Sequence, residues 1–289
     1  MSARLRGIAQ QTEQIVAAGS YRTSDGREVS VAAAVEAARD GTRVYGPGPV
    51  EPGPSIPVSS APAPSAPART VLEVTGESSL EAARRLGGEV AVLNFASARN
   101  PGGGYLNGAQ AQEEALCRAS ALYTCLLRAR EFYDHHRAHR DPFYTDRVVH
   151  SPGVPVFRDD RGRLLDQPYT AGFLTSAAPN AGVVLRTAPE RAADLPAALA
   201  VRAGRVLETA AAHGYRRLVL GAWGCGVFRN DPVQVAGAFR TLLGPGGRFA
   251  GAFERVAFGI LDRSPGATVR AAFDRAFPED AARPGQLQP

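Results

Sequence analysis

The stretch that decides the fold reads VLNFASARNPGGGYLNGAQAQEE, residues 92–114. Its first residues form an apolar run that is typical of a buried strand, and three consecutive glycines follow. Helix-forming residues then continue, and they predict a long helix over residues 111–133 that begins with Gln112, Glu113 and Glu114. A strand, a glycine-rich loop and a helix in this order predict an α/β unit with a ligand site beyond the carboxyl end of the strand.

The residues of this loop suit a phosphorylated sugar. Because Gly102, Gly103 and Gly104 carry no side chains, a ligand can lie against the backbone, and N–H groups can point at anionic oxygens. Of the two acids, Glu113 could hold a sugar hydroxyl and Glu114 could protonate a glycosidic oxygen. Glycines also serve flexible turns, and helix starts attract acids, so these residues alone leave a structural role open.

The order of these residues resembles the signature of the poly(ADP-ribose) glycohydrolases, in which three glycines, a short spacer and Gln-Glu-Glu follow one another. The preceding Asn-Pro and the helical N-terminus resemble the bacterial branch most, and the resemblance covers roughly residues 2–277. It implies a macrodomain fold with an ADP-ribose cleft, Glu114 as the catalytic acid and Glu113 as a contact to ribose hydroxyls. Ser97 and Asn100 become candidates for ribose or adenosine contacts.

A second glycine-rich loop, GAWGCGVFRN at residues 221–230, follows another apolar run and precedes a predicted helix. Its Gly-x-x-Gly-x-Gly pattern has neither the lysine of a P-loop nor the spacing of a dinucleotide fold. Beside the first loop, it is interpreted as a diphosphate-binding loop similar to that of macrodomains, where a phenylalanine packs by the distal ribose. The predicted substrate contacts are therefore Gly102, Gly103, Gly104, Gln112, Asn100 and Ser97 from the first loop, and Gly224, Cys225, Gly226, Val227 and Phe228 from the second.

Strands that alternate with helices predict a three-layer α/β/α sandwich, and the resemblance makes this a macrodomain with a mixed sheet and an N-terminal helical extension. We expect four segments: an extension that packs on the main body (1–44), a Pro-rich flexible linker (45–70), a catalytic domain (71–278) and a tail (279–289). Further predicted elements are strands at 147–149, 154–157, 172–176 and 182–185, and a helix over 189–213.

Composition limits the partners. The net charge is +5, and all 33 basic residues are arginines, which suits a polyanion. No arginine run interleaved with aromatic residues marks a nucleic-acid surface, so only the basic balance favours a nucleic-acid-binding protein and no sequence-specific nucleic acid is expected. Without an apolar run near 18 residues or a signal-peptide core, no membrane association is expected, and a cytoplasmic protein is.

The remaining reactive side chains favour structural roles. Three cysteines cannot build a disulfide framework, and packing is expected for each, including Cys225. The histidines at residues 135, 136 and 139 lack a further ligand at a clear spacing, so no metal is predicted, nor an organic cofactor. Asp262 is a weaker candidate for binding adenine.

The resemblance therefore implies a glycoside hydrolase that cleaves the ribose–ribose O-glycosidic bonds of poly(ADP-ribose) and releases ADP-ribose, with Glu114 as general acid and base. Its partners would be poly(ADP-ribose), ADP-ribose and ADP-ribosylated proteins, and a monomer is expected. Two alternatives share the fold: an ADP-ribose-binding reader without catalysis, and a hydrolase that removes the last ADP-ribose from protein side chains.

Overall fold

The computed structural model describes residues 2–50 and 69–278, and its centre is a seven-stranded sheet in the order β3-β6-β7-β5-β8-β9-β4. The strands are β3 (Arg43–Tyr45), β4 (Val71–Thr75), β5 (Val90–Phe95), β6 (Val148–Arg158), β7 (Leu164–Ser176), β8 (Arg217–Leu220) and β9 (Arg255–Gly259). β6 runs antiparallel to both of its neighbours, whereas β7, β5, β8, β9 and β4 are parallel to one another. The predicted mixed sheet is confirmed. A separate hairpin pairs β1 (Ser20–Arg22) with β2 (Glu28–Ser30).

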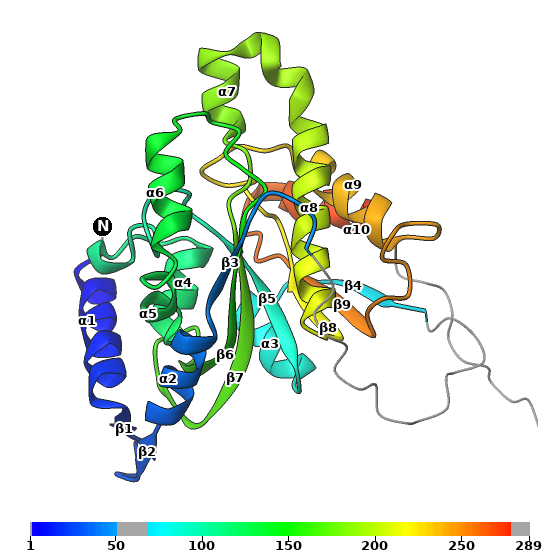
Figure 1. Ribbon diagram of the computed structural model, residues 1–289. Helices are drawn as coiled ribbons and strands as arrows, with labels where there is room; N and C mark the ends of the chain where they lie inside the picture. Colours follow the sequence, from blue (N-terminus) through cyan, green and yellow to red (C-terminus); the bar gives the residue numbers. More distant parts are fainter. Residues whose placement is uncertain (1, 51–68, 279–289) are drawn as a thin grey trace, which may run out of the picture.

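Helices cover both faces of the sheet (Figure 1). One face carries α1 (Ala3–Ala18), α2 (Ala32–Gly41), α3 (Ser79–Leu86), α4 (Gln112–Ala119), α5 (Leu122–Leu126) and α6 (Arg130–Ala138). The other carries α8 (Leu195–Ala212), α9 (Pro232–Leu243) and α10 (Thr268–Ala276), while α7 (Ala181–Thr187) projects beyond the sheet. Short 3-10 helices are η1 (Tyr105–Asn107), η2 (Pro189–Asp194) and η3 (Pro265–Ala267). The three-layer α/β/α class is therefore confirmed.

The central strand β5 shows why the sequence folds into three layers. Successive side chains of a strand point to opposite faces. Val90 and Val92 enter the hydrophobic core under α1–α6, whereas Ala91 and Leu93 enter the core under α8–α10. Because all four are buried, the first four residues of the strand form an unbroken apolar run, and the first glycine-rich loop follows the end of the strand.

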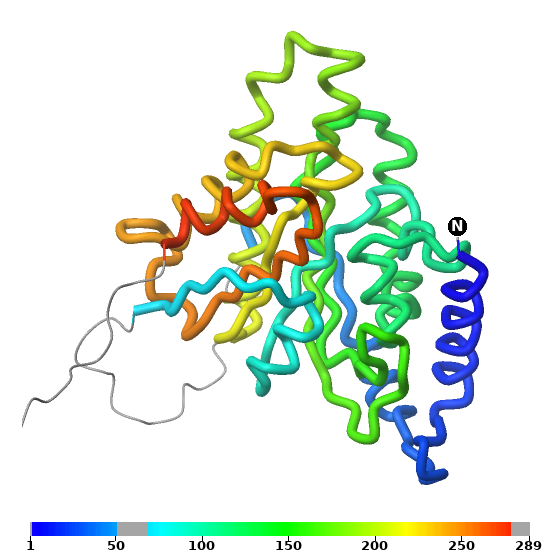
Figure 2. The backbone as a smooth tube through the Cα atoms, turned by 180° about the vertical axis from the view of Figure 1, so that it is seen from behind, coloured from blue at the N-terminus to red at the C-terminus, as the bar shows by residue number. Residues whose placement is uncertain are grey.

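The N-terminal segment joins the rest of the molecule in two ways. Its helix α1 lies along α4 at the side of the molecule, as the rear view also shows (Figure 2). The edge strand β3, which the sequence did not predict, pairs with β6 and places Tyr45 inside the sheet. Most of the expected linker and all of the expected tail (279–289) lie outside the described residues.

The long helix predicted over 111–133 is wrong, because the chain forms α4, α5 and α6 there. The first break falls at Ser120, which is extended and bridges to Val156 of β6. The N–H of Ala121 donates to the carbonyl of Pro155 at 3.1 Å. Pairing with a distant strand thus replaces the helical hydrogen bonds at a point where no glycine or proline warns of it.

Other boundaries also differ. The strand predicted at 182–185 is helix α7, whose start is capped by the Asn180 side chain accepting from the N–H of Val183. The pieces predicted at 147–149 and 154–157 form the single strand β6 with a register shift, and β7 begins well before residue 172. The helix predicted over 189–213 is divided into η2 and α8. No helix of the described residues is long and apolar enough to cross a membrane.

Two buried histidines, His136 and His150, make the stability of this fold depend on pH. His150 is 2% exposed, its Nε2 lies 2.9 Å from the Tyr215 hydroxyl, and its ring stacks on His213 at 3.7 Å between centroids. Burial and the neighbouring His213 lower the pKa of His150 to about 3, and burial lowers that of His136 to about 4. Both rings are therefore neutral in the folded protein.

We predict that stability falls as the pH drops below about 6.5, where the unfolded chain takes up protons that the folded protein excludes. Between pH 8 and pH 5.5, His136 and His150 should each reduce the free energy of unfolding by about 1.4 kcal/mol. Urea denaturation at both pH values checks this. In His150→Gln, the loss in the free energy of unfolding between pH 8 and pH 5.5 should be smaller by the contribution of His150. An unchanged pH dependence in that variant would contradict the assignment.

Candidate active site

The first glycine-rich loop packs directly against the two acids at the start of α4. Gly102 and Gly103 have φ values of 66° and 59°, in the left-handed region that favours glycine. A Cβ at Gly103 would lie 2.5 Å from Glu114 Oε1 and 3.2 Å from Glu113 Oε2. The glycines expected to face a ligand thus also make room for both carboxyl groups.

Glu113 is 3% exposed and faces the end of β5. Its Oε2 accepts from the N–H of Ser97 at 2.7 Å, and its Oε1 accepts from Asn94 Nδ2 at 3.3 Å. Burial raises the pKa of Glu113 to about 8, and the charge of Glu114 adds to this, while the Ser97 and Asn94 hydrogen bonds oppose it. Glu113 therefore holds a proton at neutral pH.

Glu114 is also buried, but the loop backbone holds it instead. Its Oε1 accepts from the N–H of Gly104 at 2.9 Å, and its Oε2 accepts from the N–H of Ala111 at 3.1 Å. The second bond satisfies a backbone donor that the start of a helix leaves without an intrahelical partner. The position of the Glu114 carboxyl group thus depends on two backbone N–H groups of the loop, those of Gly104 and Ala111.

Gln112 uses its whole amide within the protein. Its Oε1 accepts from the N–H of Phe95 at 2.9 Å, while Nε2 donates to the Leu93 carbonyl at 2.8 Å and to Ser79 Oγ at 3.0 Å. The amide therefore ties the start of α4 to the end of β5 and to α3. This fixes where the neighbouring glutamates point.

The second loop is shaped by a glycine and an asparagine. Gly224 has a φ of 73°, and a Cβ there would lie 2.5 Å from Asn230 Nδ2. The same Nδ2 donates to the carbonyls of Pro179 at 2.8 Å and of Gly224 at 3.2 Å. The loop is thereby closed on itself before α9 begins, with Pro232 in its first turn.

Its tip offers backbone donors. Within the described part of the chain, the N–H groups of Gly226, Val227 and Phe228 have no hydrogen-bond acceptor. The Val227 side chain is 82% exposed, and the Phe228 ring lies 5.8 Å from that of Tyr144. Neighbouring free N–H groups at a glycine-rich turn are a common arrangement for binding anionic oxygens.

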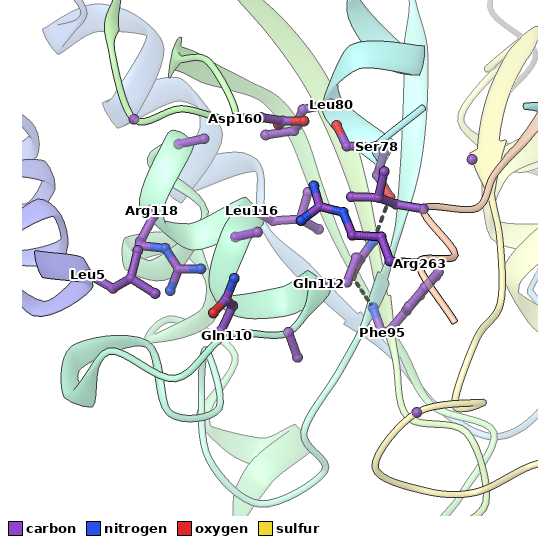
Figure 3. A pocket seen from close by; sticks show the side chains of 18 of the residues that line it. Leu5, Ser78, Leu80, Phe95, Gln110, Gln112, Leu116, Arg118, Asp160 and Arg263 are labelled. Carbon is purple, nitrogen blue, oxygen red and sulfur yellow. Dashed lines mark hydrogen bonds between the residues drawn. The ribbon is translucent and has the colours of Figure 1, made fainter. Parts of the chain in front are cut away.

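A cleft of about 630 Å³ adjoins both loops. Figure 3 shows Gln112 near its centre, with Phe95 and Arg263 to one side and Gln110 and Arg118 to the other. Cys225 and Gly226 of the second loop also line it, as do Ala111 and Gln112, whereas Glu113 and Glu114 are not among its lining residues. Its volume is within the usual range for small-molecule sites.

Several residues singled out in the sequence make hydrogen bonds or packing contacts within the protein. Asn100 is exposed, and its N–H donates to Ser97 Oγ at 3.2 Å. The Asp262 carboxylate accepts from the N–H groups of Ser264, Val269 and Arg270, and so holds a turn and the start of α10. Burial raises the pKa of Cys225 to about 12, so its thiol stays protonated, as packing requires.

The sequence reasoning missed Asn94 and Thr175. Both are fully buried, face each other on β5 and β7, and are joined by Asn94 Nδ2 donating to Thr175 Oγ1 at 3.1 Å. A buried amide that also reaches Glu113 is part of the site. The sequence does carry a signal for Asn94, because this asparagine interrupts an otherwise apolar strand. Among the described residues, no three His, Cys, Asp or Glu side chains form a group that could hold a metal ion.

Comparisons with known proteins agree on one family. A family model described as the catalytic domain of microbial-type PARG, poly(ADP-ribose) glycohydrolase, matches residues 9–159. The structure of this enzyme from Thermomonospora curvata is 48% identical, with a TM-score of 0.85 over 96% of this chain and 100% of that chain. It has also been solved with the inhibitor ADP-HPD, with a TM-score of 0.84 at the same identity and coverage. A Deinococcus radiodurans enzyme in complex with ADP-ribose is 42% identical, with a TM-score of 0.73 over 84% of this chain and 97% of that chain. A comparison with curated proteins gives no match.

The fold and the paired acids thus define a class, that of glycoside hydrolases built on a macrodomain-like sheet. Within it, the chain belongs to the microbial-type poly(ADP-ribose) glycohydrolase family. The predicted family and fold class are confirmed.

We predict that Gly103→Ala loses at least about 100-fold in turnover of poly(ADP-ribose), because the new Cβ overlaps Glu114 Oε1 at a φ that alanine rarely adopts. Gly204→Ala is the matched control, since a Cβ on this helical glycine meets no atom within 4 Å. Rates and melting midpoints of both variants check this. Full activity in folded Gly103→Ala would contradict the packing argument.

Proposed function

We propose that the protein hydrolyses the ribose–ribose O-glycosidic bonds of poly(ADP-ribose) and releases ADP-ribose, with Glu114 as general acid and base. One observation carries this proposal: two buried carboxyl groups stand side by side at the start of α4 and face the same glycine. Paired carboxyl groups are the usual machinery of glycoside hydrolysis. Family membership and the relatives solved with ADP-ribose and ADP-HPD support the same substrate.

The reaction needs one proton that the pair can hold and return. Glu114 protonates the departing ribose oxygen as the C1″–O2′ bond breaks and an oxocarbenium-like ribose forms. Its carboxylate then takes a proton from the attacking water, whose oxygen bonds to C1″. The proton taken from water restores Glu114 to its acid form, so the cycle leaves the pair with the same number of protons. The raised pKa of the buried Glu113 limits the negative charge beside it.

The remaining site residues orient the substrate. Glu113 and the backbone at Ser97 contact the ribose hydroxyls, Phe228 packs beside that ribose, and the N–H groups of residues 226–228 bind the diphosphate. Gly104 and Ala111 fix Glu114 through their own N–H groups. We also assign Gln112 a positioning role, because its amide joins the start of α4 to the end of β5 and to α3.

The cleft beside the diphosphate loop fits the adenosine half of the ligand. Leu80, Phe95 and Ile260 give it apolar walls on which a flat base can pack. Ser78 and Asp160 add polar groups near Leu80 (Figure 3). We further propose that the protein acts as a monomer on ADP-ribosylated proteins in the cytoplasm. The free thiols of Cys117, Cys125 and Cys225 fit a reducing compartment.

We predict that Glu114→Gln lowers the release of ADP-ribose from radiolabelled poly(ADP-ribose) by about 1,000-fold or more, since general acid and base catalysis are both lost. Its affinity for ADP-ribose, measured by calorimetry, should stay within about threefold, because the amide keeps the shape of the side chain. Glu190→Gln, an exposed change on η2, controls for a general effect of removing one charge.

The outcomes separate the alternatives. A near-wild-type rate in Glu114→Gln would disprove its role. An intact polymer with the wild-type protein, alongside binding of ADP-ribose, would show a reader. Release of ADP-ribose from mono-modified protein but not from polymer would show the hydrolase that removes the last unit.

A further inference from the structure

The N-terminal helix α1 contacts the loop that holds Glu114, and it does so through a buried hydroxyl group. Tyr105 is 1% exposed, and its hydroxyl lies 2.8 Å from Glu13 Oε1 and 3.2 Å from the Ala9 carbonyl oxygen, both on α1. Glu13 is itself half-buried. A hydrogen bond between a buried hydroxyl and a partly buried carboxyl group is costly to break on one side only.

Tyr105 stands next to the residue that fixes the acid. The N–H of Gly104 donates to Glu114 Oε1, and the N–H of Tyr105 donates to the Gly102 carbonyl at 3.0 Å. The Tyr105 ring lies 5.1 Å from that of Tyr123, and a Cβ on Gly102 would approach the Tyr123 ring to 2.9 Å. The tyrosine side chain thus holds the turn from which the glycine donor projects.

A second contact holds the far end of the same turn. The N–H of Ser2 donates to the Gly108 carbonyl at 3.1 Å. Gly108 has a φ of 74°, and a Cβ there would lie 2.4 Å from the Ser2 carbonyl oxygen. Helix α1 therefore contacts the loop at both ends of η1, at its first residue Tyr105 and at Gly108, which follows its last residue.

We propose that α1 is a clamp on the catalytic loop and that Tyr105 is a positioning residue, which keeps the Gly104 N–H in the place where it orients the Glu114 carboxyl group. The proposal rests on the proposed function, since it needs Glu114 as the acid. A loop with three glycines has more backbone freedom than any other sequence, whereas proton transfer requires the carboxyl group to be held to a fraction of an ångström. The bond to α1 supplies that restraint.

The N-terminal segment offers a matched control in a second buried tyrosine. Tyr21 is 5% exposed, and its hydroxyl donates to the Leu165 carbonyl at 2.6 Å. This bond joins β1, the strand that follows α1, to β7, and it involves no residue of the loop. Tyr21→Phe therefore weakens the attachment of the N-terminal segment without releasing η1.

The test compares Tyr105→Phe with Tyr21→Phe in the full chain, below the melting midpoint of both. Tyr105→Phe should lower kcat on poly(ADP-ribose) about 10- to 100-fold with the Kd for ADP-ribose within about threefold. Tyr21→Phe should keep kcat within about twofold, although both variants melt at a lower temperature. A kcat within twofold in Tyr105→Phe, or an equal loss in both variants, would overturn the positioning role.

The partner side chain provides a rescue. Glu13→Gln keeps an acceptor for the tyrosine hydroxyl and should retain most of kcat, whereas Glu13→Ala should match Tyr105→Phe. The double variant Glu13→Ala, Tyr105→Phe should lose no more than either single variant, because both remove the same bond. Additive losses would show that the two residues act separately and would contradict the clamp.

Hydrogen exchange separates failure of the clamp from failure of the proposed function. The amides of residues 102–111 should exchange faster in Tyr105→Phe than in wild type, with no such change in Tyr21→Phe. If the wild-type protein leaves the polymer intact, the proposed function fails, and this exchange pattern still decides whether α1 restrains the loop. Unchanged exchange in Tyr105→Phe would overturn the clamp whatever the activity.

Discussion

Two carboxyl groups buried side by side are the constraint on which the rest of the site depends. Burial of a carboxylate is costly unless donors surround it, and a second carboxylate beside it adds repulsion. The hydrogen bonds to the pair come from backbone and amide donors: the N–H groups of Ser97, Gly104 and Ala111, and Asn94 Nδ2. For Glu113, burial outweighs these hydrogen bonds and raises the pKa of its carboxyl group.

The surrounding architecture follows from the need to place those donors. Asn94 lies within β5 and Ser97 follows its end by two residues, so the central strand places both donors to Glu113. The glycine-rich loop carries the Glu114 site, and it must curl tightly because its donor and its acceptor are only ten residues apart. Gln112 joins both halves, since its amide bonds the end of β5 and lies at the start of α4.

The sequence allowed the layers, the loop and the two acids to be predicted, because an apolar strand, adjacent glycines and adjacent acids are local patterns. The features that depend on contacts between distant parts of the chain could not be predicted in this way. Ser120 leaves the helical path because β6 pairs with it, and β3 exists because β6 offers a free edge. The sequence did not predict the hydrogen bonds of Gln112 and Asp262 for the same reason: their side chains bond to backbone groups whose positions only the folded chain defines.

The structure gives a second reason for the glycines at residues 102–104, in addition to the one expected from the sequence. Residues 102–104 were expected to expose backbone to a ligand. In the structure, a Cβ on Gly103 would overlap a catalytic carboxyl group, and one on Gly102 would press on Tyr123. Close approach within the protein therefore requires these glycines before any ligand arrives. The freedom that glycine brings must then be removed elsewhere, and the surfaces that press on this loop, α4 from within and α1 from outside, remove it.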